Sequence, residues 1–268
     1  MRLPVEDFNL EATLDSGQVF GFKKNGDKVY EGVIAGHPVK LWQTKNQLHT
    51  ENGFPKKKLI HFFDLGRDLQ PIYDILRSDV PLAPAGEALK GLRLIRQDPW
   101  EALACFILSS NNNVKRIQGI WKNLSEFFNK DTLTFPSSSQ IASSHEKILR
   151  ALGLGYRAPF LLNTAQFVSK NPKYLQWIRE AEYAEAKRRV LAFPGIGEKV
   201  ADCVLLYGFQ KQEAFPVDVW ILRVMRKLYF KNRKISEDKA RQFGMKRWGK
   251  NAGYIQQYLF HGARIGVL

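Results

Sequence analysis

The sequence predicts an α+β fold that is predominantly helical, and two observations carry that prediction. Short strand-like stretches separated by turns are confined to about residues 18–50, whereas helical patterns fill the chain from about residue 87 onward. The length of 268 residues is enough for one large domain or two modest ones with a real hydrophobic core. We therefore expect an N-terminal α+β domain with a small antiparallel sheet over residues 1–86, and an all-helical region in two parts over residues 87–268.

The expected sheet is built from three successive segments. Residues 29–34 (VYEGVI), 39–44 (VKLWQT) and 46–50 (NQLHT) contain many β-branched and aromatic residues, and the turn sequence AGHP separates the first two. This spacing is typical of an antiparallel meander.

Helices are expected after the sheet. The first two are placed around residues 56–64 and 68–78, and the sequence PLAPAG at 81–86 is interpreted as a linker. Asp98 and Pro99 then combine an N-cap with a proline at the first helical position, which opens a helix through WEALACFIL. Further helices are expected over 113–129, 145–151, 156–170, 182–192, 198–208, 218–229, 235–246 and 250–264, with a short loop at 134–140.

The charge balance points to a polyanionic partner. Lys and Arg number 41 against 26 Asp and Glu, which gives a net charge of +15. A surplus of this size favours nucleic acid, although basic side chains also serve as plain solvated surface. No apolar run approaches the roughly 18 residues that a membrane span needs, and the N-terminus lacks an apolar signal segment. We therefore expect an intracellular protein of the cytoplasm or nucleoid with no membrane association.

Cysteine use limits the possible cofactors. The chain has only Cys105 and Cys203, whereas an iron–sulfur cluster or a structural zinc usually takes four side-chain ligands. A disulfide scaffold is also unexpected at this size and cysteine density. We therefore expect two reduced, buried thiols, no iron–sulfur cluster and no cofactor that catalysis requires.

The stretch LAFPGIGEKVADCVLLYGF at 191–209 is the most informative part of the chain. It predicts two helices around a Pro-Gly-Ile-Gly turn, as a hairpin over about 182–208. Gly195 and Gly197 permit a close approach of the backbone, and the start of the second helix offers free N–H groups to a phosphate. A plain hairpin between two helices would show the same pattern, but in a basic helical protein it favours contact with DNA.

Lys199 and Asp218 are the candidate catalytic residues. Lys199 lies in the first turn of the second helix, where the helix dipole disfavours a cation and so favours an amine nucleophile. Cys203 follows at i+4, on the same face of the helix. Asp218 comes nineteen residues after Lys199. Both residues also have a purely structural interpretation, because Asp218 is a good N-cap for the next helix and most lysines are plain surface.

Six segments, taken in order, resemble the 8-oxoguanine DNA glycosylase family, within the helix-hairpin-helix (HhH-GPD) superfamily of DNA glycosylases. They are SGQVF (16–20), DPWEALACFILSSNNNVKRI (98–117), LGLGYRA (152–158), FPGIGEKVADC (193–203), PVDV (216–219) and WGKNAGYIQQYLF (248–260). Together they extend over essentially the whole chain, and such an ordered set is highly specific. The resemblance implies a monomeric, bifunctional glycosylase and AP lyase of base excision repair. Its substrate would be double-stranded DNA with 8-oxoguanine, preferably opposite cytosine.

The resemblance also assigns the catalytic roles. Lys199 would attack C1′ of the damaged nucleotide and form a Schiff base, which allows strand cleavage by β-elimination. Asp218 would support the developing positive charge and assist the proton transfers. The chemistry agrees with this division, because an amine can form an imine and a carboxylate cannot.

By the same resemblance, four residues would manage the opened duplex, since the target base must leave the stack. Asn111 would fill the vacated space and Tyr156 would wedge beside it. Arg116 and Arg157 would contact the estranged cytosine, whose acceptor atoms suit arginine donors.

The lesion pocket implied by the resemblance consists of Gly17, Cys203, Gln256 and Phe260. Phe260 can stack on the flipped base, and Gln256 can read its Watson–Crick edge, because residues at i and i+4 share one helix face. The carbonyl of Gly17 would separate the lesion from guanine, whose N7 is an acceptor only. Without the resemblance, Gly17 would be interpreted as part of a turn before a strand, and Phe260 as core.

In the hairpin, the resemblance gives Gly195 and Gly197 contacts to the DNA backbone. It also implies a monovalent cation on the backbone carbonyls of Leu191, Phe193 and Ile196, for which no side chain provides a signature.

One position departs from the pattern. Animal and fungal members carry a histidine two residues after the catalytic aspartate, and this chain has Trp220. The N-terminal domain is also short, which is typical of a prokaryotic form.

Three other functions remain as alternatives. A non-catalytic helix-hairpin-helix module would explain the hairpin and the charge, but not Lys199 together with Asp218. A monofunctional glycosylase for alkylated bases or uracil would activate water through the aspartate alone and would not need Lys199. A relative that carries an iron–sulfur cluster and acts on oxidised pyrimidines or on mispaired adenine would need four C-terminal cysteines, and none follows Cys203.

Overall fold

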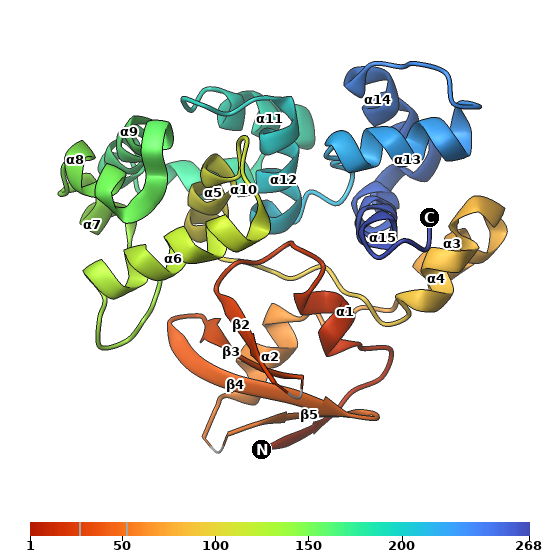
Figure 1. Ribbon diagram of the computed structural model, residues 1–268, viewed down its shortest axis with the longest axis horizontal. Coiled ribbons are helices and arrows are strands. Elements are labelled where there is room, and N and C mark those ends of the chain that lie inside the picture. The colour runs from red at the N-terminus through yellow and green to blue at the C-terminus, as the bar shows by residue number, and fades with distance from the viewer. Residues whose placement is uncertain (27, 52) are drawn as a thin grey trace.

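The computed structural model describes residues 1–26, 28–51 and 53–268. Figure 1 shows the antiparallel sheet formed by the N-terminal part of the chain, with most of the helices packed above it. The predicted α+β architecture is confirmed, because the five strands of the described chain all belong to the N-terminal region and the rest is helical.

The five strands pair antiparallel in the order β1-β5-β4-β3-β2. They are β1 (Arg2–Pro4), β2 (Phe22–Asn25), β3 (Val29–Ile34), β4 (His37–Thr44) and β5 (Gln47–Thr50). The predicted meander is β3, β4 and β5, in whose register Leu41 lies opposite both Tyr30 and Thr50. Strand β1 was not among the predicted strands, because its pairing with β5 joins residues more than forty positions apart, such as Leu3 and Leu48.

One face of the sheet packs against α1 (Leu10–Leu14) and α2 (Lys56–Phe62) in a small core of its own. Tyr30, Leu41 and Leu48 of the sheet are almost completely buried there. Each such side chain contributes about 1.5–3 kcal/mol on burial, so this core holds the sheet together locally.

The linker predicted at 81–86 is wrong. A 3-10 turn over Val80–Leu82 leads directly into helix α4 (Ala83–Ala88). Pro84 lies in the first turn of α4, where the missing N–H of proline costs nothing, and Ala85 is fully buried. The proline therefore starts this helix, which packs against the C-terminal helix (Figure 1).

The other helices largely follow the predicted order. They are α3 (Gln70–Ser78), α5 (Pro99–Leu108), α6 (Val114–Phe128), α7 (Ser138–Ala142), α8 (Glu146–Leu149), α9 (Ala158–Lys170), α10 (Tyr174–Glu180), α11 (Tyr183–Leu191), α12 (Glu198–Phe209), α13 (Val219–Tyr229), α14 (Glu237–Trp248) and α15 (Ala252–Arg264), with a π turn at Arg150–Leu154 and 3-10 turns at Gly155–Arg157 and Gly249–Asn251. Asp98 caps α5 as predicted, accepting from the N–H groups of Trp100 and Glu101 at 2.9 and 3.0 Å. The loop predicted at 134–140 is wrong in its second half, because Ser137 and Gln140 form a capping box that starts α7.

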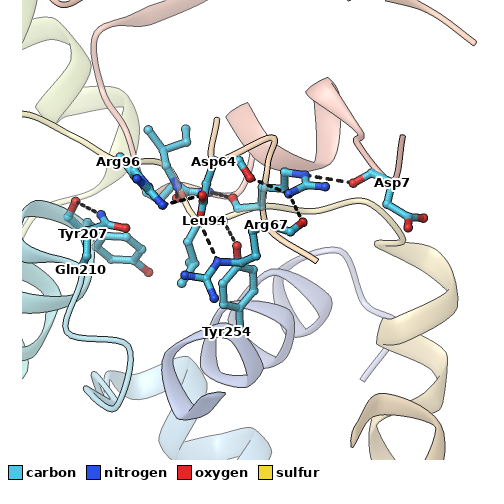
Figure 2. Close-up of polar contacts among 11 residues, drawn as sticks. Asp7, Asp64, Arg67, Leu94, Arg96, Tyr207, Gln210 and Tyr254 are labelled. Atoms are coloured by element: carbon cyan, nitrogen blue, oxygen red, sulfur yellow. Dashed lines mark hydrogen bonds and ion pairs between the residues drawn. The ribbon is translucent and has the colours of Figure 1, made fainter. Parts of the chain in front are cut away.

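Arg93 joins the sheet to the helical region. Its side chain is 2% exposed and donates to four backbone carbonyls at 2.6–3.3 Å, those of Glu6, Asp7, Asp64 and Arg67. Figure 2 shows this junction, where the Asp64 carboxylate also pairs with Arg67 and Arg96. A buried charge is tolerated only when its donors are satisfied, so these carbonyls fix the sheet against the helices. No helix of the described residues is long and apolar enough to cross a membrane.

Candidate active site

The predicted hairpin is present as α11 and α12, joined by residues 192–197. Gly195 has a φ of +77°, and a Cβ at this position would lie 2.4 Å from the ring of Phe160. Both facts require glycine there. Gly197 is different, because its φ is −98° and a Cβ would meet nothing within 4 Å. The space beside the first turn of α12 is therefore open to a partner.

Lys199 and Asp218 both act on the thiol of Cys203. Lys199 is half-buried in the first turn of α12, and Cys203 follows four residues later on the same helix. Burial raises the pKa of Cys203 to about 11; the charge of Lys199 opposes this shift and the charge of Asp218 adds to it. The structure therefore brings these three predicted residues into one electrostatic environment, in which the thiol stays protonated near neutral pH.

Asp218 is the N-cap of α13, as its sequence context predicts. Its Oδ1 accepts a hydrogen bond of 2.8 Å from the N–H of Ile221. The residues before it, 214–217, are buried, so the backbone that carries the carboxylate is held on one side by packing and on the other by the helix. The cap engages only one of the two carboxylate oxygens.

The sequence prediction missed a partly buried ionic network that includes two acids of α12. Lys187 of α11 pairs with Glu198 at 2.8 Å and with Asp202 at 2.9 Å, and Tyr183 donates to Asp202 at 2.6 Å. Arg241 of α14 pairs with Glu198 at 2.9 Å. Burial raises the pKa of Asp202, and Lys187 opposes that rise. The only signal in the sequence is the i, i+4 spacing of the two acids. The network ties α11, α12 and α14 together and so sets the position of the helix that carries Lys199.

Three residues of the predicted lesion pocket link α15 to the rest of the site. Gly17 has a φ of +80°, and a Cβ there would lie 3.5 Å from the ring of Phe260. Gln256 is 4% exposed, and its Nε2 donates to the carbonyl of Pro216 at 3.1 Å. Its Oε1 is buried and has no hydrogen-bond partner among the described residues. Gln256 therefore holds the segment that leads to Asp218 while presenting one free acceptor.

Arg264 is a neighbour of this pocket that the sequence prediction missed. Its guanidinium lies 5.4 Å from the centre of the Phe260 ring, and its Nη1 would be 2.8 Å from a Cβ on Gly17. The i, i+4 spacing from Phe260 is the signal that could have found it.

Asn111, Tyr156 and Arg157 come together around the carbonyl of Ser110. Tyr156 donates to that carbonyl at 3.1 Å, and Arg157 donates to it at 2.8 Å and to the carbonyl of Asn111 at 2.9 Å. Asn111 is exposed with a φ of +47°, and Tyr156 is 47% exposed. Arg157 is buried, whereas Arg116 is exposed in the first turn of α6. The two arginines thus have different environments.

Trp220, in the place of the histidine of animal and fungal members, is 41% exposed in the first turn of α13. The guanidinium of Arg223 lies 5.4 Å from the centre of its ring. An exposed aromatic surface therefore adjoins Asp218.

Metal-binding side chains do not gather at this site. Within the described parts of the chain, no group of three or more His, Cys, Asp or Glu is placed to hold a metal ion. A cation on carbonyls would use other atoms. The Phe193 carbonyl accepts a long bond of 3.4 Å from Ile196 N–H, so it keeps acceptor capacity, and the cation on Leu191, Phe193 and Ile196 stays a prediction.

Fold and site together define a helix-hairpin-helix protein in which a lysine, a thiol and an aspartate are grouped beside the hairpin. Residues 1–103 match the family described as 8-oxoguanine DNA glycosylase, N-terminal domain, and residues 104–250 match the HhH-GPD superfamily base excision DNA repair protein. The chain belongs to this superfamily of base excision DNA repair proteins and, within it, to the 8-oxoguanine glycosylase type.

Known relatives resemble the chain over nearly its full length. It is 32% identical, over all of its own length and 97% of the relative, to the "Probable N-glycosylase/DNA lyase" of Methanothermobacter thermautotrophicus. It is 28% identical, over 97% of its length and 78% of the relative, to "N-glycosylase/DNA lyase OGG1" of Arabidopsis thaliana. The crystal structure of Clostridium acetobutylicum 8-oxoguanine glycosylase/lyase, in complex with double-stranded DNA containing cytosine opposite 8-oxoG, superposes with a TM-score of 0.93 at 29% identity. That match covers 100% of this chain and 99% of the other.

Proposed function

We propose that this protein excises 8-oxoguanine from double-stranded DNA, preferably opposite cytosine, and then cleaves the strand at the abasic site. The observation that carries the proposal is the convergence of Lys199 and Asp218 on the Cys203 thiol. The glycosylase/lyase names of the relatives support both activities, and the clostridial complex supports the substrate.

Lys199 is the nucleophile in this reaction. The neutral amine attacks C1′, and the N-glycosidic bond breaks with its electron pair leaving on the base, which takes up a proton. The attacking nitrogen loses a proton, the C1′–O4′ bond breaks with its electron pair on O4′, and O4′ takes up a proton, which opens the sugar ring and leaves a protonated imine between Nζ and C1′. Loss of a proton from C2′ expels the 3′ phosphate by β-elimination. The dipole at the start of α12 disfavours a cation at this position and so favours the attacking form.

Asp218 stabilises the positive charge that develops on the sugar and assists the proton transfers. Its role as the cap of α13 is compatible with this chemistry, because the cap uses Oδ1 and fixes the direction of the carboxylate.

Base recognition is divided among the residues around α15. Phe260 offers a ring for the flipped base, and the free Oε1 of Gln256 is an acceptor for the donors on its Watson–Crick edge. The carbonyl of Gly17 accepts from N7–H of 8-oxoguanine and repels the N7 lone pair of guanine. Leaving that carbonyl without a donor once the flipped base covers it costs about 1–3 kcal/mol, which corresponds to roughly one to two decades of selectivity.

The other strand is held by the remaining predicted residues. Asn111 and Tyr156 fill the space that the base leaves, and Arg116 and Arg157 read the estranged cytosine. Gly195 and Gly197 let the hairpin approach the DNA backbone; the carbonyls of Leu191, Phe193 and Ile196 would hold a monovalent cation there. An enzyme with this substrate works where the DNA lies, in the cytoplasm or nucleoid of a prokaryotic cell.

A panel of duplexes tests this function. Each duplex carries one damaged base (8-oxoguanine, uracil, 3-methyladenine or thymine glycol) opposite one of the four normal bases, and excision and strand cleavage are measured separately. We expect the fastest excision for 8-oxoguanine opposite cytosine, with strand cleavage following it. Faster excision of an alkylated base, or equal excision opposite all four bases, would contradict the proposal.

A further inference from the structure

The carbonyl groups of the two residues that flank Gly17, Ser16 and Gln18, are both connected to Tyr207 by hydrogen bonds through one intermediate residue. On the preceding side, Nε2 of Gln257 donates to the carbonyl of Ser16 at 3.1 Å. The Oε1 of the same amide accepts a hydrogen bond from the hydroxyl of Tyr207. One buried side chain thus connects the turn at Gly17 to helix α12.

On the following side, the link runs through Gln97. Its Nε2 donates to the carbonyl of Gln18 at 2.6 Å, and its backbone N–H donates to the carbonyl of Tyr207 at 3.3 Å. Figure 2 shows Tyr207 at this point of α12, where its carbonyl also accepts from the side chain of Gln210. One chain of hydrogen bonds starts at the Tyr207 side chain and the other at its backbone carbonyl, and they end on the residues before and after Gly17.

Burial makes these hydrogen bonds costly to break. Ser16, Gln18 and Gln257 are fully buried, and Tyr207 is 4% exposed. Water therefore does not compete, and an unmade bond would leave a buried polar atom unpaired. Because a carbonyl can only accept, Ser16 turns the amide nitrogen of Gln257 toward itself, and the remaining Oε1 is held by the donor of Tyr207. Tyr207 thus anchors the far end of the amide that holds the turn.

The backbone of Gly17 cannot by itself fix the direction of its carbonyl. Its backbone adopts positive and negative φ about equally, so a glycine carbonyl that discriminates between bases needs its neighbours to be fixed. Between the anchored carbonyls of Ser16 and Gln18 lie only the φ and ψ torsions of Gly17 and Gln18, and the Gln18 side chain is itself held by hydrogen bonds to the Arg93 carbonyl and the Ile95 N–H. Tyr207 lies two turns after Lys199 and one turn after Cys203 on the same helix, so the fixed turn and the nucleophile share one frame.

We propose that Tyr207 and Gln257 are positioning residues for lesion discrimination, which hold the Gly17 carbonyl toward N7 of the flipped base. The inference rests on the proposed reading of N7–H by Gly17. It assigns a function to two buried polar residues that the proposed reaction does not otherwise use.

Two variants and one matched control test the proposal. Tyr207→Phe removes one hydroxyl and keeps the ring that stacks on Phe106 at 5.3 Å, and Gln257→Met removes the amide at similar volume. The control is Tyr258→Phe, on the same helix as Gln257, because the Tyr258 hydroxyl is buried and has no partner among the described residues. Single-turnover excision is measured on 8-oxoguanine and on its analogue with N7–H replaced by C–H, and strand cleavage is measured on a preformed abasic site.

The ratio of the two excision rates is the decisive quantity. We expect the unmodified protein to excise 8-oxoguanine about ten- to a hundredfold faster than the analogue, the value of one buried hydrogen bond. Gln257→Met should bring this ratio close to one, and Tyr207→Phe should lower it by about three- to tenfold, both through slower excision of 8-oxoguanine. Cleavage at the abasic site, where no base is read, should be unchanged, and Tyr258→Phe should behave as the unmodified protein.

The outcomes distinguish the positioning role of Tyr207 and Gln257 from the proposed reading of N7–H by Gly17. If the unmodified protein treats both substrates equally, Gly17 does not read N7, and both ideas fall. If it discriminates and both variants keep its ratio, the pair does not position Gly17 and only this inference falls. An equal loss of abasic-site cleavage would show general damage to the fold and would also overturn the positioning role. Should Gln257→Met fail to fold, Tyr207→Phe alone decides.

Discussion

The carboxylate of Asp218 accepts a hydrogen bond from the backbone N–H of Ile221 at 2.8 Å, so one side chain caps α13 while its charge raises the pKa of the Cys203 thiol. The capping role needs an oxygen acceptor, whereas the catalytic role needs a negative charge. Substitutions at this position can therefore separate the two.

Asp218→Asn should slow base excision strongly and leave the fold intact. The asparagine oxygen can still cap α13, but it carries no charge to stabilise the sugar cation, so a loss of about 10²- to 10⁴-fold in the single-turnover rate is expected. Asp218→Ala should show the same loss of rate and, in addition, about 1 kcal/mol less stability toward denaturant because the cap is gone. An asparagine variant with a near-normal rate would exclude the charge from catalysis.

Lys199→Gln should abolish the covalent intermediate. Borohydride reduces an imine between the lysine and C1′, so the unmodified protein should form a stable adduct with 8-oxoguanine DNA and the variant should form none. Peptide mapping of the adduct should place the DNA on Lys199. A normal adduct yield from the glutamine variant would assign the chemistry to another amine.

The two glycines of the hairpin should respond differently to alanine. Gly195→Ala forces a side chain into a φ of +77° and into the Phe160 ring, so it should lower stability by about 1–3 kcal/mol and weaken DNA binding. Gly197→Ala meets no atom within 4 Å and has an ordinary φ. It should fold normally, and any loss of affinity for DNA would come from the added methyl alone. Binding and thermal unfolding of the pair, measured together, check this; equal effects on stability would contradict it.

The two arginines that we propose to contact the opposite strand should also differ. Arg116 is exposed, so Arg116→Ala should reduce the preference for cytosine by about 1–3 kcal/mol and leave the unfolding temperature unchanged. Arg157 is buried and bound to the carbonyls of Ser110 and Asn111. Arg157→Ala should therefore destabilise the protein as well as relax the preference. Excision opposite each normal base, with unfolding curves, distinguishes the two; an unchanged preference in Arg116→Ala would remove that residue from cytosine recognition.

His261 should contribute stability that is lost in weak acid, against an opposite contribution from Glu101, because burial raises the pKa of the Glu101 carboxyl to about 7 and that group favours the folded state as the pH falls. Burial, reinforced by the charge of Arg264 and opposed by Asp15, lowers the pKa of this histidine to about 4, from 6.5. The unfolded chain then binds a proton that the folded chain refuses. Stability from this group is complete above about pH 6.5 and is lost as the pH falls toward 4, by about 2–3 kcal/mol.

Urea unfolding of the unmodified protein and of His261→Leu at pH 5 and pH 7.5 measures this effect. The difference in stability between the leucine variant and the unmodified protein should shift by about 2 kcal/mol in favour of the variant from pH 7.5 to pH 5, because both proteins share the opposing Glu101, whereas Tyr258→Phe on the same helix should follow the unmodified protein. The same slope with pH in all three proteins would exclude His261 as the source.

The parts of the fold that the sequence predicts well are those set by local chemistry. The ends of the hairpin follow from the Pro-Gly-Ile-Gly turn, and the start of α13 follows from Asp218 as an N-cap. Helix α4 was missed because its stability comes from burial of Ala85 and its neighbours rather than from its composition. The site divides in the same way. Lys199 and Cys203 are one turn apart, so their spacing alone places them on one face of the helix.

The contacts that support this site join distant positions. Lys187 and Asp202 belong to different helices, and Tyr207 and Gln257 are fifty residues apart. No periodicity links such pairs, so only the folded chain reveals them.

The four carbonyls around Arg93 belong to the segments that follow β1 and α2, so one side chain from residue 93 joins both of them. A shortened protein beginning at residue 87 would keep the arginine and lose every one of these four acceptors, and water would take their place. It would also uncover apolar side chains that now share the core of the sheet, such as Ile95. The N-terminal domain therefore completes the surface of the helical part, and its removal should favour aggregation rather than leave a smaller soluble enzyme.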